Sequence, residues 1–243
     1  MQRREFIRSI VAVALGGGVA TGQTAPLGDA ARRWKGRADS KVKRWDVITV
    51  GNLSRNRYWG EGDDKAMRSV LCTCTLIVGE EFALLVDPSV KDAAEMAREL
   101  DRRTGKKPDS ITACFVTHEH GDHWAGIENF PKAKWLAAPG VADVLNRTAR
   151  LSKQFEGVQG RLLDAIDVVA TPGHTANHHA LRFDCDGRSI VTAGDAVATH
   201  DFFRNRQGFY NSVDFAQASQ SMDKLAFIAD IIVPGHDNYF LVE

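Results

Sequence analysis

The segment THEHGDHWAG, residues 117–126, places three histidines and two acidic residues close together in the chain. A solvated charged segment would be rich in lysine and arginine, whereas imidazole and carboxylate groups can donate lone pairs to a metal ion. The spacing His-x-His-x-Asp-His offers four potential ligands from one short loop: His118, His120, Asp122 and His123. One loop cannot complete two coordination spheres, so a metal centre needs ligands from elsewhere in the chain.

Three further candidate ligands occur where strands of the second half are expected to end. His174 lies in ATPGHTA, Asp195 in TAGDAV and His236 in VPGHDN, and each directly follows a glycine. Glycine allows the backbone to turn tightly and present the next side chain above a sheet. The seven candidates include five of the eight histidines, and their residue types predict a metal centre.

Alternating strands and helices are expected to position these ligands. Apolar runs rich in β-branched residues predict strands at 45–50, 70–78, 82–87, 111–117, 134–138, 165–171, 178–184, 189–194 and 231–234. Helical periodicity predicts helices at about 90–104, 141–147 and 215–229, the first of them ending at Gly105. No linker divides the pattern, so we expect α/β layering in a single domain spanning residues 45–243.

The composition limits the class of protein. Of 243 residues, 44% are hydrophobic, and 31 basic residues balance 31 acidic ones. A pI near 7.1 argues against a general nucleic-acid or membrane-surface binder, so we expect a small-molecule substrate and no nucleic-acid partner. The oligomeric state stays open. The cysteines lie in apolar segments, which predicts buried free thiols at Cys72, Cys74, Cys114 and Cys185.

The first 30 residues form a different kind of segment. Arg3 and Arg4 precede an apolar run at 10–20, a pattern typical of a twin-arginine export signal. The run is shorter than the roughly 20 residues that span a bilayer, so we expect no membrane span in the mature protein. This interpretation predicts cleavage between Gly22 and Ala31 and a periplasmic location. An uncleaved amphipathic anchor or a misassigned start is the alternative.

The ordered motifs resemble those of the metallo-β-lactamase superfamily from about Val70 to His236. The resemblance implies a four-layer αββα sandwich with a two-metal site at one edge of two facing sheets. Carried over position by position, the first metal would be held by His118, His120 and His174, and the second by Asp122, His123 and His236. Asp195 is implied to bridge the metals, and Asp87, in LLVDPS, to orient a ligand. Two zinc ions are the default, although iron or manganese also suits nitrogen and oxygen ligands.

The resemblance also implies a hydrolytic mechanism. Two metal ions about 3.5 to 4 Å apart hold a water and lower its pKa, so that hydroxide forms near neutral pH. Asp122 would orient this nucleophile, and Asp195 would complete the catalytic centre. Two ions, two carboxylates and hydroxide leave a net charge of about +1, which favours substrates or transition states with negative charge. Small esters, lactones and thioesters therefore qualify.

Departures from particular branches of the superfamily narrow this expectation. True β-lactamases of the fold generally lack the bridging aspartate that Asp195 supplies, so antibiotic hydrolysis is not the first choice. Enzymes resembling glyoxalase II carry a C-terminal helical domain, whereas seven residues follow His236 here. The short C-terminal part resembles more closely the compact group around metallo-β-lactamase domain-containing protein 1, whose motifs do not settle a substrate.

Three alternative functions stay open. Persulfide dioxygenases resemble the same motif while using one iron ion, which would make the protein an oxidoreductase. A dinuclear site can also cleave phosphodiesters or β-lactams. A metal-binding module without turnover is the third alternative, and retention of the whole ligand set disfavours it.

Contacts with a substrate are predicted less directly. The aromatic residues of SRNRYWG would form a lip over the site, and the tryptophan after the histidine cluster would wall it, unless they pack against the domain. A histidine of TANHHAL would line the pocket or form a structural hydrogen bond. The polar residues of THDFFRNRQGFY would meet an anionic substrate or belong to a solvated loop. The candidate contacts are Tyr58, Trp59, Trp124, His178, His200 and Arg204.

Overall fold

The computed structural model of the protein describes residues 40–242. The export signal predicted at residues 1–30 lies outside this range. The first strand, β1 (Val42–Thr49), begins ahead of Trp45, where the domain was expected to start. Among the described residues, no helix is long and apolar enough to cross a membrane.

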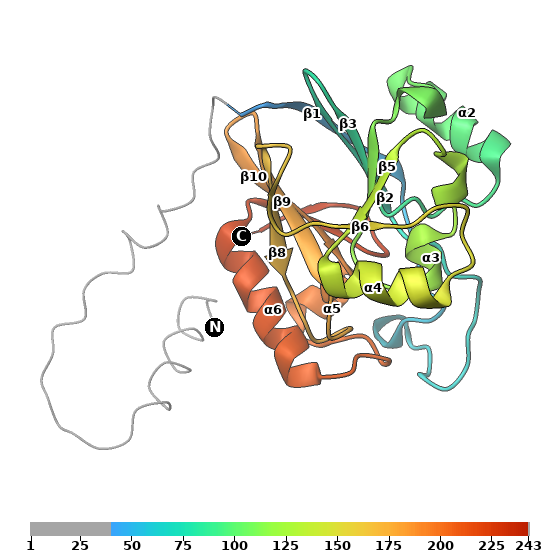
Figure 1. Ribbon diagram of the computed structural model, residues 1–243. Coiled ribbons are helices and arrows are strands. Elements are labelled where there is room, and N and C mark those ends of the chain that lie inside the picture. Colours follow the sequence, from blue (N-terminus) through green and yellow to red (C-terminus); the bar gives the residue numbers. More distant parts are fainter. Residues whose placement is uncertain (1–39, 243) are drawn as a thin grey trace, which may run out of the picture. The chain divides into compact units, whose positions relative to one another are not determined.

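Two six-stranded sheets form the centre of the fold (Figure 1). The first sheet runs in the order β1, β2 (Cys74–Gly79), β3 (Ala83–Val86), β4 (Ala113–Val116), β5 (Lys134–Ala137) and β6 (Glu156–Gly157). The second runs in the order β12 (Phe240–Leu241), β11 (Ile231–Pro234), β10 (Arg188–Gly194), β9 (His179–Cys185), β8 (Ile166–Ala170) and β7 (Gly160–Leu162). Parallel pairing runs from β3 to β6 and joins β10 to β11, and the other pairs are antiparallel.

Alternate side chains of the central strands enter different hydrophobic cores. In β3, Leu84 belongs to the core between the sheets, whereas Leu85 belongs to the core between the first sheet and its helices. In β11, Ile231 and Val233 enter the core between the sheets, and Ile232 packs on the opposite face. Both strands are apolar throughout because both faces of each sheet are covered.

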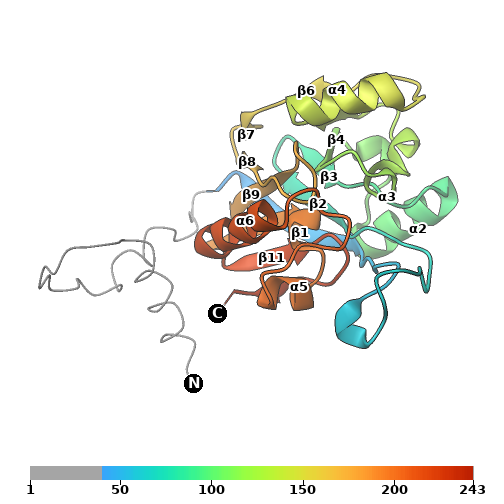
Figure 2. The same ribbon diagram turned by 90° about the horizontal axis from the view of Figure 1, so that it is seen from below.

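Helices cover the outer face of each sheet. α2 (Ala93–Thr104) and α4 (Pro139–Thr148) pack on the first sheet, and α6 (Phe215–Ile228) packs on the second (Figure 2). The shorter helical elements are α3 (Gly121–Trp124), α5 (His200–Arg204), η1 (Arg57–Trp59), η2 (Pro108–Ser110), η3 (Ile127–Asn129) and η4 (Asp195–Val197). The order helix, sheet, sheet, helix confirms the expected αββα sandwich.

Two elements begin three or four residues later in the chain than predicted. The helix predicted from residue 90 begins at Ala93, because the side chain of Asp92 caps its first turn. The strand predicted from residue 70 begins at Cys74, because Leu71 pairs with Asn52 outside the main sheet. The short strands β6, β7 and β12 were not predicted, since two or three residues carry little periodicity.

Candidate metal centre

Strand ends from both sheets bring the seven predicted ligands together. In the second sheet, β8, β10 and β11 all point the same way, so their carboxyl ends meet at one edge. The N–H of His179 donates to the carbonyl of Thr117 (3.0 Å), which joins this edge to the end of β4 in the first sheet. His118 and His120 follow β4, Asp122 and His123 lie in α3, His174 follows β8, Asp195 follows β10, and His236 follows β11.

Two glycines allow the close approach of these strand ends. Gly194 has a φ of +49°, and a Cβ atom there would lie 2.5 Å from Oγ1 of Thr117. A Cβ atom on Gly235 would collide with Oδ1 of Asp195. Side chains at either position would displace the ligand-bearing backbone, which agrees with the expected role of the glycines that precede ligands.

Three histidines and one carboxylate oxygen form the first group of donors. Nδ1 of His120 lies 3.0 Å from Nε2 of His118 and 2.9 Å from Nε2 of His174. Oδ2 of Asp195 lies 3.2 Å from Nε2 of His174 and 3.9 Å from Nε2 of His118. All four side chains thus direct a donor atom towards one region.

The second group of donors uses the other oxygen of the same aspartate. Oδ1 of Asp195 lies 3.1 Å from Nε2 of His236 and 3.3 Å from Nε2 of His123. Oδ2 of Asp122 lies 3.5 Å from Nε2 of His236 and 3.8 Å from Nε2 of His123. The Asp195 carboxylate therefore lies between the two groups, as the resemblance implied for a bridging ligand.

The donor atoms fit divalent metal ions. Nε2 of His123 and Oδ1 of Asp195 are buried and have no hydrogen-bond partner among the described residues. A buried polar atom without a partner is costly, and coordination of a metal ion would satisfy both atoms. Imidazole nitrogens and carboxylate oxygens suit zinc, iron and manganese alike, so the donor set does not select one metal.

Burial and charge give His118, His174 and Asp195 the protonation states that metal binding requires, whereas neighbouring negative charge raises the pKa values of His123 and His236, so that a metal ion has to displace their protons. Burial lowers the pKa of His118 well below its usual value and that of His174 to about 4, so both rings are neutral at pH 7. Burial alone would raise the pKa of Asp195, but the neighbouring imidazoles, above all His236 and His123, hold it well below its usual range. Neutral imidazoles and an ionised carboxylate are the forms that bind metals.

Asp87, predicted to orient a ligand, lies in contact with His123 and with Thr117. Its Oδ2 lies 2.9 Å from Nδ1 of His123, and it accepts hydrogen bonds from the N–H (2.8 Å) and hydroxyl (2.9 Å) of Thr117. Asp87 has a φ of +51°, an unfavourable conformation for a residue with a side chain. The Thr117 hydroxyl in turn lies 3.1 Å from Nδ1 of His118, so one network fixes two imidazoles.

Cys72 is a neighbour of the centre that the sequence did not single out. Its Sγ lies 3.1 Å from Nδ1 of His123 and 3.9 Å from Oδ2 of Asp87. Burial raises the pKa of this thiol, so it is uncharged at neutral pH. All four cysteines are free and buried, which confirms the prediction made from their apolar surroundings. No periodic signal distinguishes Cys72 from the three that pack in cores.

Two of the residues predicted to contact a substrate instead contact other parts of the protein. His178 is fully buried, its Nε2 accepts from the N–H of Ala196 (3.3 Å), and its Nδ1 lies 2.8 Å from the hydroxyl of Thr171. Both ring nitrogens thus have partners, which favours the structural alternative. The ring of His200 stacks on Phe240, with 4.2 Å between ring centroids.

The aromatic candidates also make contacts within the protein. The hydroxyl of Tyr58 donates to Oε1 of Gln207 (2.7 Å). The indole of Trp59 is 55% exposed and donates to Oδ2 of Asp201 (3.2 Å). The half-buried Trp124 donates to a backbone carbonyl within the histidine loop and packs against the first core. Arg204 lies exposed on α5.

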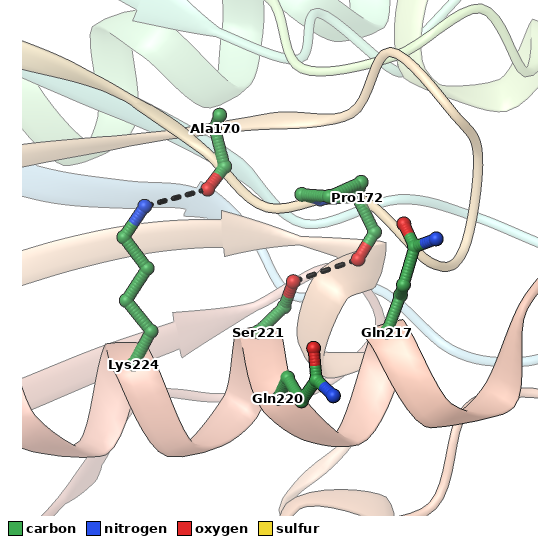
Figure 3. A pocket seen from close by; sticks show the side chains of 6 residues that line it. All are labelled: Ala170, Pro172, Gln217, Gln220, Ser221 and Lys224. Atoms are coloured by element: carbon green, nitrogen blue, oxygen red, sulfur yellow. Dashed lines mark hydrogen bonds between the residues drawn. The ribbon is translucent and has the colours of Figure 1, made fainter.

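A hollow of about 470 Å³ lies outside this centre, between α6 and the segment that follows β8 (Figure 3). Lys224 donates to the carbonyl of Ala170 (2.9 Å), and Ser221 donates to that of Pro172 (2.7 Å). None of the seven ligands lines the hollow. Its hydrogen bonds instead hold α6 against the loop that carries His174.

Comparisons with known proteins agree with this geometry. The profile of the Metallo-beta-lactamase superfamily matches residues 68–236. The chain belongs to this superfamily. Human metallo-beta-lactamase domain-containing protein 1 is 30% identical over 223 residues, which cover 85% of this chain and 75% of the human protein.

Further matches come from hydrolases of the superfamily and from the same fold. The hydroxyacylglutathione hydrolase of Xanthomonas axonopodis pv. citri is 34% identical over 125 residues, or 50% of this chain and 44% of that protein. A structure from B. thuringiensis with N-decanoyl-L-homoserine bound at the active site has a TM-score of 0.62 at 20% identity. That match covers 82% of this chain and 94% of the other, and it shows the shared fold. Membership and relatives together identify the protein as an enzyme of a metallo-hydrolase superfamily.

Proposed function

We propose that the protein is a dinuclear metal-dependent hydrolase that acts on a small ester, lactone or thioester. The observation that carries this proposal is the position of the Asp195 carboxylate, whose two oxygens face two separate groups of histidines. His118, His120 and His174 would hold one ion, and Asp122, His123 and His236 the other. When bound, two such ions supply a water of lowered pKa and polarise the bond to be cleaved.

Exposure of the ligands indicates where the substrate enters. The side chain of Asp122 is 21% exposed, whereas those of Asp195 and His236 are 5% and 2% exposed. His120 is also partly exposed. A substrate therefore approaches from the side of His120 and Asp122. The Asp122 carboxylate can accept a hydrogen bond from the attacking water there and orient it.

The substrate class rests on the chemistry of the site and on the relatives. One relative is a hydroxyacylglutathione hydrolase, and a structure of the same fold holds N-decanoyl-L-homoserine at its active site. True β-lactamases of the fold generally lack a bridging aspartate, so Asp195 disfavours β-lactam hydrolysis. Zinc is the proposed metal, with iron or manganese as the alternatives that the nitrogen and oxygen donors allow.

Metal content tests the dinuclear proposal most directly. Elemental analysis of protein purified without chelator or added metal should find about two zinc ions per chain. About one iron ion, with oxygen uptake on a persulfide, would instead favour the oxidoreductase alternative. Hydrolysis of an ester, lactone and thioester panel should be lost in Asp122→Asn. Asp143→Asn, which removes an exposed carboxylate from α4, is the matched control.

We propose that the protein acts in the periplasm, because Arg3, Arg4 and the apolar run at 10–20 match a twin-arginine signal. Replacing both arginines by lysine in the full chain should leave the protein in the cytoplasmic fraction. Equal periplasmic amounts of the variant and the natural chain would contradict this route.

A further inference from the structure

Arg55 is a buried arginine that pairs with no carboxylate within residues 40–242. Its side chain is 8% exposed, and Nε is buried with no hydrogen-bond partner within residues 40–242. The guanidinium carbon lies 3.7 Å from the centroid of the Tyr210 ring. A buried guanidinium is costly unless an anion compensates its charge, and stacking on an aromatic ring compensates it in part.

Other arginines of the neighbouring segments have carboxylate partners. Arg57 pairs with Asp63 and Arg68 pairs with Glu61. In the segment of Tyr210, the guanidinium of Arg206 donates to Asp223 (2.7 Å). Arg55 is more buried than these paired arginines and has no carboxylate partner in the described part of the chain, so a ligand that supplies an anion would satisfy it.

The chain segment of Arg55 begins at one side of the metal centre. The carbonyl of Leu71 accepts hydrogen bonds from Nδ1 of His236 and from the N–H of Asn52, both at 2.8 Å. Arg55 lies three positions after Asn52, a length of chain that spans at most about 10 Å. The backbone of Arg55 is therefore anchored near His236, and its long side chain extends from that anchor.

The segment that carries the Tyr210 ring is anchored near His174, a ligand of the first group. The N–H of Val213 donates to the carbonyl of His174 (3.2 Å), and Tyr210 lies three positions before Val213. The contact between Arg55 and Tyr210 thus joins a segment anchored beside a second-group ligand to a segment anchored beside a first-group ligand.

Neutral hydrogen-bonding groups without partners lie on the same segments. The Asn56 amide nitrogen and the hydroxyls of Thr199 and Ser212 are buried and unsatisfied. Their segments pack together around a small core of Leu53, Ala198, Phe202 and Phe209. One positive charge accompanied by neutral polar groups suits a singly charged anion better than a doubly charged one.

We propose that Arg55 binds a carboxylate of the substrate, so that the enzyme prefers acyl substrates that carry a carboxylate away from the bond to be cleaved. This inference rests on the proposed hydrolase function. The planar guanidinium provides two parallel N–H donors to a carboxylate, and Tyr210 holds its plane. Arg55 is thus a specificity-determining residue of the site.

The test compares two esters that differ in charge, 4-nitrophenyl acetate and the mono-4-nitrophenyl ester of glutaric acid. With the metal-loaded enzyme, Arg55→Gln should lower kcat/KM for the glutarate ester about 10- to 100-fold, mainly through KM, as loss of a charged hydrogen bond does. Hydrolysis of the acetate ester should change little. Arg55→Lys should lose part of the preference, because it keeps the charge without the planar donors.

Arg147→Gln removes an exposed charge from α4 and is the matched control. If Arg55→Gln lowers kcat/KM equally for both esters, Arg55 has a structural role. If Arg204→Gln lowers kcat/KM for the glutarate ester as much as Arg55→Gln does, the preference arises from the overall positive charge and not from a site at Arg55. Either result overturns the inference.

Calorimetric titration with glutarate separates this inference from the proposed function. If neither ester is hydrolysed, the hydrolase proposal fails, while glutarate binding that is lost in Arg55→Gln still supports the anion site. Absence of binding, or equal binding to both proteins, overturns it.

Discussion

Oδ2 of Asp87 lies 2.9 Å from Nδ1 of His123, on the opposite side of the ring from the Nε2 that faces Asp195. This contact places a proton on Nδ1 and directs Nε2 towards Asp195, where it can bind a metal ion once its own proton is displaced. His236 is fixed in the same way by the Leu71 carbonyl. The second group of donors is therefore oriented by partners that lie behind it.

Replacing Asp87 should weaken the second metal position. Asp87→Asn should lower the affinity for the more weakly held ion about 10- to 100-fold, because the His123 ring loses its charged acceptor. Competition with a chromophoric chelator measures this affinity, with Asp143→Asn as the control. Unchanged affinities for both ions would contradict an orienting role for Asp87.

Removing the shared carboxylate should affect both positions together. Asp195→Ala should reduce the metal content to one ion or less and lower turnover about 100-fold or more, because each group of donors loses an oxygen ligand. Elemental analysis and ester hydrolysis provide the two readouts. Retention of two ions with wild-type turnover would rule out a bridging role.

Gly235→Ala should destabilise the protein by about 1 to 3 kcal/mol, since its Cβ atom would collide with Asp195. Gly121→Ala is the matched control, because a Cβ atom there meets nothing within 4 Å. Urea unfolding of both variants measures the free energy of unfolding. Equal unfolding midpoints would show that the end of β11 accommodates the added Cβ atom without loss of stability.

The metal-free protein should lose stability in acid through His174. Burial lowers the pKa of this ring to about 4, whereas the unfolded value is near 6.5. Between these values the unfolded chain binds a proton that the folded chain does not, so stability falls as the pH falls and levels off below about 4. The contribution is at most about 3 kcal/mol. Urea unfolding at several pH values gives the free energy of unfolding, whose slope against pH should be smaller in His174→Asn than in the natural chain across this window. Parallel plots of this free energy against pH would refute the prediction.

Residue type and position at strand ends were sufficient to predict which side chains the fold brings together at the candidate centre. His118, His174 and Asp195 follow apolar strands, and the structure brings their side chains together with the other four predicted ligands. The alternation of strands and helices predicted α/β layering, and the family resemblance implied the αββα order. Predictions of this kind succeed because they depend only on residues that lie close together in the sequence.

The surroundings of the centre were harder to predict, because they depend on contacts between distant segments. Tyr58 and Trp59 were expected either over the site or packed against the domain, and their polar atoms pair with Gln207 and Asp201 from the other half of the chain. The stacking of Arg55 on Tyr210 is equally long-range. No local pattern specifies which arginine of the segment will be buried without a carboxylate.

The ligands come from the ends of strands in both sheets, and this has a consequence for how the protein unfolds. The sheets cannot separate while a metal ion is held by His118 from one and by His174 from the other, so binding acts as a cross-link within the core. Free metal at about 1,000 times its dissociation constant would raise the unfolding free energy by about 4 kcal/mol. In the metal-bound protein, strand ends far apart in the sequence should therefore exchange their amide hydrogens at a common rate. Chelation should make unfolding less cooperative and separate these rates.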